Sequence, residues 1–203
     1  MKTLIVSYLP RGARSHTKKL RDAFLENMDS EEIEYLDLME DVPDLFMSDS
    51  VMAYIKRNYL GEELSVKEKK AMAKMDRMTR QLKKADVVVL ATPMYNFSFP
   101  AAVKAWFDSV MLKGETWDAG KGGYIGMMKG KKALLLMASG GAYDKESSSY
   151  EHAVSLAKVE FGFMGFTDVR AVTAEGMNMV PDKDKVISDA QEEVRRIVKE
   201  WYG

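Results

Sequence analysis

The chain has 203 residues with 30 basic and 31 acidic side chains, a formal net charge of −1 and no cysteine. This charge balance favours neither nucleic acid nor an anionic membrane as a partner, and the lack of cysteine excludes disulfides, thiol catalysis and cysteine-ligated metals. No apolar stretch approaches the roughly 18 residues of a membrane span, and no secretion signal follows Met1. We therefore expect a single cytoplasmic domain over residues 1–203.

Apolar strands alternate with amphipathic helices along the chain. Strands are predicted over residues 3–8, 32–38, 87–91, 132–137 and 167–173. Helices are predicted over residues 15–28, 51–59, 65–84, 99–111, 149–164 and 184–201. Ser65 and Glu68 form a capping box for the third helix, and Tyr150 begins the inward face predicted for the fifth. Residues 113–130 show no clear periodicity and are predicted to leave the sheet.

This alternation predicts an α/β fold. Repeated strand–helix–strand units build a parallel sheet with helices on both faces, which is a three-layer sandwich. Five strands in one domain fit the flavodoxin-like strand order 2-1-3-4-5 better than the six-stranded dinucleotide-binding order.

The turn after the first strand has the features of an anion site. Gly12 permits unusual backbone angles, Ser15 and Thr17 offer hydroxyls, and Arg14 and His16 can add charge or donors. The helix that follows directs free N–H groups and the positive end of its dipole at the turn. The sequence is neither GxGxxG nor a Walker motif, so a single phosphate fits better than a pyrophosphate. Alternatively, Ser15 simply caps the helix.

The loop after the third strand suits a flat ring system. An unbroken apolar run over residues 87–91 indicates a strand buried on both faces. It is followed by Pro93, Met94, Tyr95, Asn96 and Phe97. Ligands of open α/β sheets bind at this end of the strands. The apolar groups would cover a ring, and the Asn96 amide would bond its polar edge. A hydrophobic loop that caps the core is the alternative.

The loop after the fourth strand completes the predicted crevice. Ser139, Gly140 and Gly141 allow close approach of the backbone to a ligand, and Tyr143 can cover a ring or donate a hydrogen bond. The three loops lie on neighbouring strands in the predicted order, so together they fit a planar mononucleotide. His152 has no partner at metal-ligand spacing, and we expect no metal site and a structural or surface role for this residue.

Three motifs resemble those of the FMN-dependent NAD(P)H azoreductases, flavodoxin-like enzymes that also reduce quinones. The motifs are Pro93-Met94-Tyr95-Asn96-Phe97, Ser139-Gly140-Gly141 and Ala174-Glu175-Gly176. The resemblance extends from Leu4 to the C-terminal helix. The chain departs from the family at Tyr8-Leu9-Pro10, where small hydroxyl residues are usual, and at His16, where Gln is usual. It also has Ala138 before Ser139-Gly140 and lacks the Arg often found in that loop.

The resemblance implies which residues bind FMN. Ser15, His16 and Thr17 would hold the phosphate; Pro93, Met94, Tyr95, Asn96 and Phe97 would cradle the isoalloxazine; and Ser139, Gly140, Gly141 and Tyr143 would close its other edge. It also implies a homodimer in which the partner subunit completes each site. No side chain need act as an acid or base, although Asn96 and Tyr143 are candidates for tuning the flavin.

The resulting functional hypothesis is an FMN-dependent NAD(P)H oxidoreductase. NADH or NADPH would deliver hydride to the flavin, and a quinone or azo compound would then take two electrons in the same place, by a ping-pong mechanism. One alternative is a flavodoxin-type electron carrier with protein partners and no nicotinamide site. Another is a binding or regulatory module without flavin, because fold alone does not determine function.

Overall fold

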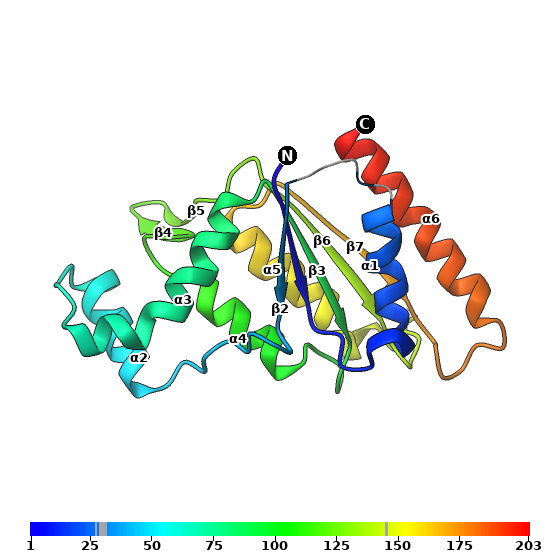
Figure 1. Cartoon of the computed structure of the whole chain (residues 1–203), viewed down its shortest axis with the longest axis horizontal. Coiled ribbons are helices and arrows are strands. Elements are labelled where there is room, and N and C mark those ends of the chain that lie inside the picture. Colours follow the sequence, from blue (N-terminus) through cyan, green and yellow to red (C-terminus); the bar gives the residue numbers. More distant parts are fainter. Residues whose placement is uncertain (27, 29–31, 145) are drawn as a thin grey trace.

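The computed structural model describes residues 1–26, 28, 32–144 and 146–203, and it contains a parallel sheet of five strands (Figure 1). The strands are β1 (Thr3–Ser7), β2 (Ile33–Asp37), β3 (Val87–Pro93), β6 (Lys132–Ala138) and β7 (Asp168–Ala174). Their order is β2-β1-β3-β6-β7, with every neighbouring pair parallel. Since β6 and β7 are the fourth and fifth strands of this sheet, the predicted order is confirmed.

Helices cover both faces of the sheet, as Figure 1 shows. One face carries α1 (His16–Glu26) and α6 (Lys183–Tyr202); the other carries α3 (Val66–Lys84), α4 (Ala101–Val110) and α5 (Ala153–Met164). Alternate residues of the strands enter the two cores, because successive side chains of a strand point to opposite faces. Val87 and Val89 of β3 pack with the α1 and α6 side, whereas Val88 and Leu90 pack with the other. The predicted three-layer arrangement is confirmed.

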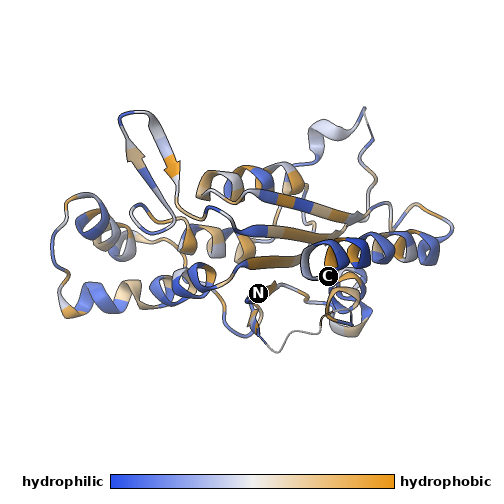
Figure 2. Ribbon diagram, turned by 90° about the horizontal axis from the view of Figure 1, so that it is seen from above, coloured by the Kyte–Doolittle hydropathy of each residue, from blue (hydrophilic) through white to orange (hydrophobic). Residues whose placement is uncertain are grey.

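The capping box predicted for α3 is present. The Ser65 hydroxyl accepts a 3.3 Å hydrogen bond from the Glu68 N–H, and the Glu68 carboxylate accepts a 2.7 Å bond from the Ser65 N–H. The apolar face of the helix is fully buried: Met72, Met75, Met78 and Leu82. Figure 2 shows apolar colour concentrated in the central strands, while the flanking helices alternate between apolar and polar. Among the described residues, no helix is both long and apolar enough to span a membrane.

Two excursions extend from the sheet beside α3 and α5 (Figure 1). The first contains α2 (Ser48–Tyr54), which continues as a π-helical turn, Ile55–Tyr59. The second is an antiparallel hairpin of β4 (Trp117–Gly120) and β5 (Gly123–Gly126). A Cβ on Gly126 would lie 2.3 Å from the Gly165 nitrogen, so only glycine lets the hairpin sit on the end of α5.

Several predicted boundaries differ from the structure. Ser148–Tyr150 forms a separate 3₁₀ turn, and Tyr150 is exposed, not inward-facing as predicted. The helix begins later because the Glu151 carboxylate accepts a 2.7 Å bond from the Val154 N–H and so caps α5. The helix predicted over 51–59 instead begins at Ser48. The end predicted for α1 falls partly on residue 27, outside the described residues, and Met28 is not helical.

Candidate active site

A hollow of about 260 Å³ lies where the loops after β1, β3, β6 and β7 meet. Eight of the predicted site residues line it: Ser15, His16, Thr17, Pro93, Met94, Tyr95, Ser139 and Gly140. Asn96, Phe97, Gly141 and Tyr143 lie outside this lining, in the same loops. Their predicted roles stay predictions. Pockets for drug-sized ligands are usually about 300–1,000 Å³, so the volume of this hollow lies slightly below that range.

One end of the hollow is built from the start of α1. The buried Ser15 precedes the helix, and its hydroxyl accepts a 3.2 Å hydrogen bond from the Lys18 N–H. Ser15 is therefore a helix cap, whatever else it binds. The equally buried Thr17 hydroxyl accepts a 3.1 Å bond from the Ala138 N–H, which ties α1 to the end of β6. The N–H groups of the first helical turn have no acceptor within the helix and favour an anion here.

Positive charge surrounds this end of the hollow. Arg11 and Lys183 line this hollow, and neither was predicted to do so. Arg14 was predicted as part of the anion site, but it is exposed and does not line the hollow. Burial, together with the charges of Lys19, Arg11 and Lys183, lowers the pKa of His16. The His16 Nδ1 atom is buried and has no hydrogen-bond partner within the described part of the chain. A buried polar atom without a partner carries a free-energy cost, which a bound ligand can offset.

The aromatic loop forms a tight, strained turn. Tyr95 and Ser98 exchange two backbone hydrogen bonds of 2.9 and 3.0 Å. The two residues between them have positive φ angles, 48° at Asn96 and 70° at Phe97. Positive φ is uncommon for residues other than glycine and is a genuine outlier for a bulky one. Such strain concentrates at functional sites.

Neighbouring elements hold this turn on both sides. The Tyr95 ring lies edge-on to Tyr8, with the centroids 6.3 Å apart, and Phe97 contacts Tyr150 at 5.7 Å. The Phe97 carbonyl accepts a 3.0 Å bond from the His152 N–H. The Tyr150 ring and the main chain of His152 thus hold the aromatic turn in place.

The glycine loop is bound by backbone hydrogen bonds to the loop after β7. Ser139 and Gly140 each accept a 3.0 Å bond, from the N–H groups of Met177 and Asn178 respectively. A Cβ on Gly140 would lie 2.4 Å from the side-chain amide nitrogen of Asn178, so a larger residue here would push that side chain aside. Met177 and Asn178 both line the hollow. The motif at the end of the fifth strand, Ala174-Glu175-Gly176, was the available signal that this loop joins the site.

Glu175 of that motif holds the main chain of Tyr143 in place through a hydrogen bond. Its carboxylate accepts a 2.9 Å bond from the Tyr143 N–H and a 3.2 Å bond from the Thr173 hydroxyl. Burial, with the negative charges of Glu175 and Glu151, raises the pKa of the Tyr143 phenol. The phenol therefore stays protonated and can donate a hydrogen bond.

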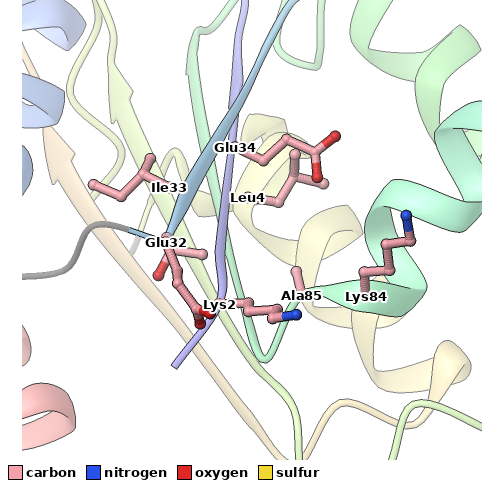
Figure 3. A pocket seen from close by; sticks show the side chains of 8 residues that line it. Lys2, Leu4, Glu32, Ile33, Glu34, Lys84 and Ala85 are labelled. Atoms are coloured by element: carbon pink, nitrogen blue, oxygen red, sulfur yellow. The ribbon is translucent and has the colours of Figure 1, made fainter.

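A second hollow, of about 230 Å³, lies at the opposite end of the sheet (Figure 3). It is formed where β1 and β2 begin and α3 ends, with Lys2, Glu34 and Lys84 at its border. Ligands of doubly wound sheets bind at the carboxyl ends of the strands. The first hollow has that position and the second does not.

Comparison with known proteins identifies the family. A family of flavodoxin-like fold matches residues 1–198. The chain belongs to the flavodoxin-like family. An "FMN-dependent NADH:quinone oxidoreductase" from Exiguobacterium is 31% identical over 100% of this chain and 97% of that protein. "FMN-dependent NADH:quinone oxidoreductase 3" from Pseudomonas aeruginosa is 38% identical over 66% of this chain, and the match spans 63% of that protein.

A crystal structure agrees with these sequence relatives. An FMN-dependent NADH-azoreductase from Bacillus anthracis, in complex with FMN, is 28% identical, superposes with a TM-score of 0.90 and matches 100% of both chains. The resemblance predicted from the sequence motifs is therefore confirmed. In this flavodoxin-like protein, as in others of the fold, the carboxyl ends of the strands are the expected ligand position.

Proposed function

We propose that the chain is an FMN-dependent NADH:quinone oxidoreductase that also reduces azo compounds. The observation that carries this proposal is the hollow where the loops after β1, β3, β6 and β7 meet. An anion-binding helix start forms one end of it, and a strained aromatic turn stands at the other. Relatives that match along the whole chain carry the same activity in their names.

The residues present fit FMN. The partnerless Nδ1 of His16 and the free N–H groups at the start of α1 suit the phosphate. The aromatic turn from Tyr95 to Ser98 suits the isoalloxazine, and Gly140, which lines the hollow without a side chain, leaves room for its other edge. The site predicted from the sequence therefore stands as our proposal for the cofactor site, with Met177 and Asn178 added to it.

When bound, FMN supplies the two-electron redox chemistry that takes a hydride from a reduced nicotinamide and gives it to a quinone or azo compound. The protein's own residues would bind and orient the flavin and its substrates. Tyr95 and Met94, which line the hollow, would exclude water from one side of the ring system. We propose that the protonated Tyr143 phenol, on the loop after β6, donates a hydrogen bond to the flavin or the acceptor. No side chain has to carry a proton through the reaction.

Donor and acceptor would use the same mouth in turn. The hollow is smaller than a usual site for a drug-sized ligand, so we expect a second planar molecule to stack on the exposed side of the aromatic turn. Phe97 and Tyr150, both more than half exposed, extend this apolar surface. The nicotinamide has to leave before the acceptor enters, which predicts ping-pong kinetics.

We further propose that the protein is a cytoplasmic homodimer. Exposed apolar side chains on the two excursions are suited to bury a contact between subunits. They include Met52, Tyr59, Leu60, Tyr124 and Ile125. Sedimentation of the flavin-loaded protein at micromolar concentration checks this: a dimer is expected, and a fully active monomer contradicts a site shared between subunits.

The visible spectrum of the purified protein, before and after NADH under anaerobic conditions, tests the proposed activity. A yellow protein that loses its colour on NADH addition is expected. A yellow protein that neither NADH nor NADPH bleaches would favour the electron carrier. A protein that stays colourless after addition and removal of excess FMN would favour the flavin-free module. Mass spectrometry of the released cofactor should find FMN and not FAD.

A further inference from the structure

The lining of the active-site hollow is unbalanced in charge. Among the described residues that line it are two permanent cations, Arg11 and Lys183, and no carboxylate. The two come from opposite ends of the chain: Arg11 lies in the loop after β1, before the 3₁₀ turn Gly12–Arg14, and Lys183 is the first residue of α6. The fold brings them to the same hollow beside His16, whose pKa both charges lower.

Neither cation is neutralised by an ion pair within residues 1–26, 28, 32–144 and 146–203. None of the ion pairs formed by the described residues includes Arg11 or Lys183. Of the acids beside Lys183, Asp182 accepts a 2.9 Å bond from the Lys185 N–H as the cap of α6. Asp184 is almost fully exposed and lies 4.0 Å from Lys19, and its effect on the His16 pKa is opposite to that of the cations but smaller. An excess of positive charge next to the start of α1 attracts an anion from solution.

We propose that Arg11 and Lys183 bind the phosphate of FMN from two sides and make the site select phosphorylated flavin over riboflavin. This inference rests on the proposed function, because it takes FMN as the ligand. The start of α1 supplies partial charges and N–H donors, whereas Arg11 and Lys183 supply two full charges. A phosphate monoester carries about −1.5 to −2 charges at pH 7, so the two cations together neutralise it.

The test compares two flavins that differ only in the phosphate. FMN and riboflavin are titrated into apoprotein, and binding is followed by the quenching of flavin fluorescence. The variants are Arg11→Gln, Lys183→Gln and the double substitution. Lys185→Gln is the matched control, since Lys185 lies on the same helix turn but pairs with Asp189 at 2.8 Å and does not line the hollow.

Each single variant should weaken FMN binding about fivefold to tenfold. This loss is smaller than the loss expected on removal of a fully buried charge pair, because both side chains are exposed. Riboflavin binding should change less than about twofold, and the control should match the wild type. The wild type should also lose FMN affinity more steeply with added salt than the double variant. Circular dichroism of the apoproteins checks that every variant is folded.

Two outcomes overturn the inference. Unchanged FMN affinity in the double variant means that the two cations do not touch the phosphate. Equal losses of affinity for FMN and riboflavin mean that the two cations act on another part of the flavin or on the fold. The two failures can be told apart. If the wild type binds neither flavin, the proposed function itself is contradicted. If the wild type binds FMN and the variants bind it equally well, only the inference about Arg11 and Lys183 is contradicted.

Discussion

The Thr17 hydroxyl accepts a 3.1 Å hydrogen bond from the main-chain N–H of Ala138, and both groups are buried. This bond joins the first turn of α1 to the last residue of β6, directly beside the proposed cofactor site. It gives Thr17 a part in the stability of the fold that is separate from any contact with a ligand.

Thr17→Val should therefore destabilise the apoprotein. Valine keeps the shape but leaves the Ala138 N–H buried without an acceptor, which costs about 1–3 kcal/mol. Thr17→Ser keeps the acceptor and is the matched control. Thermal unfolding without flavin measures the effect, with a shift of about 2–4 °C per kcal/mol for a chain of this size. Equal melting temperatures for Thr17→Val and the wild type would show that this bond contributes little.

Asn96→Gly should weaken flavin binding or shift its reduction potential without loss of apoprotein stability. Asn96 has a φ of 48°, and glycine adopts this angle freely, so the turn is kept while the amide is removed. Asn96→Leu is a poorer test, because the left-handed region costs a branched side chain about 1–2 kcal/mol. If Asn96→Gly binds FMN with unchanged affinity and potential, the amide has no contact with the flavin.

Glu160 should make stability depend on pH. It is a buried acid of α5, and its Oε2 has no partner among the described residues. Burial raises its pKa from 4.5 to about 7, a shift opposed by Lys104 at 3.8 Å and reinforced by Asp108. Between these two values the folded state holds a proton that the unfolded state has lost. Stability should therefore fall as pH rises from about 4.5 to 7, by about 3 kcal/mol, and level off above.

Glu160→Gln should remove this decline, because the amide does not ionise. Urea unfolding of apoprotein at several pH values between 5 and 8 gives the comparison, with Glu192→Gln, an exposed position on α6, as the control. An identical pH profile for Glu160→Gln and the wild type would mean that the carboxyl is ionised in the folded protein at neutral pH.

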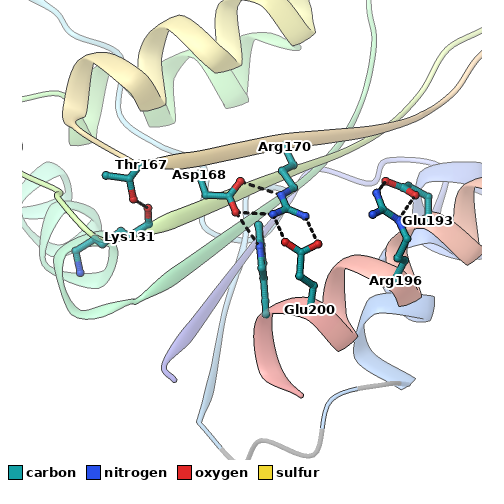
Figure 4. A network of polar contacts seen from close by, with 8 residues as sticks. Lys131, Thr167, Asp168, Arg170, Glu193, Arg196 and Glu200 are labelled. Carbon is teal, nitrogen blue, oxygen red and sulfur yellow. Dashed lines mark hydrogen bonds and ion pairs between the residues drawn. The ribbon is translucent and has the colours of Figure 1, made fainter.

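Arg170 should contribute to the stability of the fold but not to the affinity for flavin. Its guanidinium bonds Asp168 at 2.8 and 2.9 Å and Glu200 at 2.6 and 2.7 Å, and it lies over the Trp201 ring (Figure 4). This network fixes α6 to the start of β7, away from the hollow at the other end of the sheet. Arg170→Met should lower the free energy of unfolding by about 1–3 kcal/mol and leave FMN affinity unchanged.

The control for Arg170→Met is Arg196→Gln, whose partner Glu193 lies on the same helix (Figure 4). That exposed pair should contribute less than about 0.5 kcal/mol. A loss of FMN affinity in Arg170→Met as large as its loss of stability would show that α6 also positions the site, in line with the place of Lys183 at its start.

Elements with a strong local signal were predictable from the sequence. The unbroken apolar run of β3 and the capping box of α3 both occur as expected, because burial and capping act on neighbouring residues. The hairpin of β4 and β5 was not predicted: its strands have four residues each and glycine at their ends. Its position depends on the contact between Gly126 and Gly165, which is far from local.

The candidate site divides in the same way. The loops after β1, β3 and β6 were predictable because glycine, hydroxyl and aromatic residues follow directly on apolar strands. No such pattern in the sequence indicated Lys183, because its position at the hollow depends on how α6 packs against α1. The positive φ at Phe97 was also invisible in the sequence, because phenylalanine normally avoids it.

Steady-state kinetics with NADH and a benzoquinone tests the central claim most directly: that one mouth serves donor and acceptor in turn. Initial rates are measured over a range of NADH concentrations at several fixed quinone concentrations. We predict parallel lines in the double-reciprocal plot, because NAD⁺ leaves before the quinone binds. Lines that intersect would mean that both substrates bind together, and would contradict a single shared site.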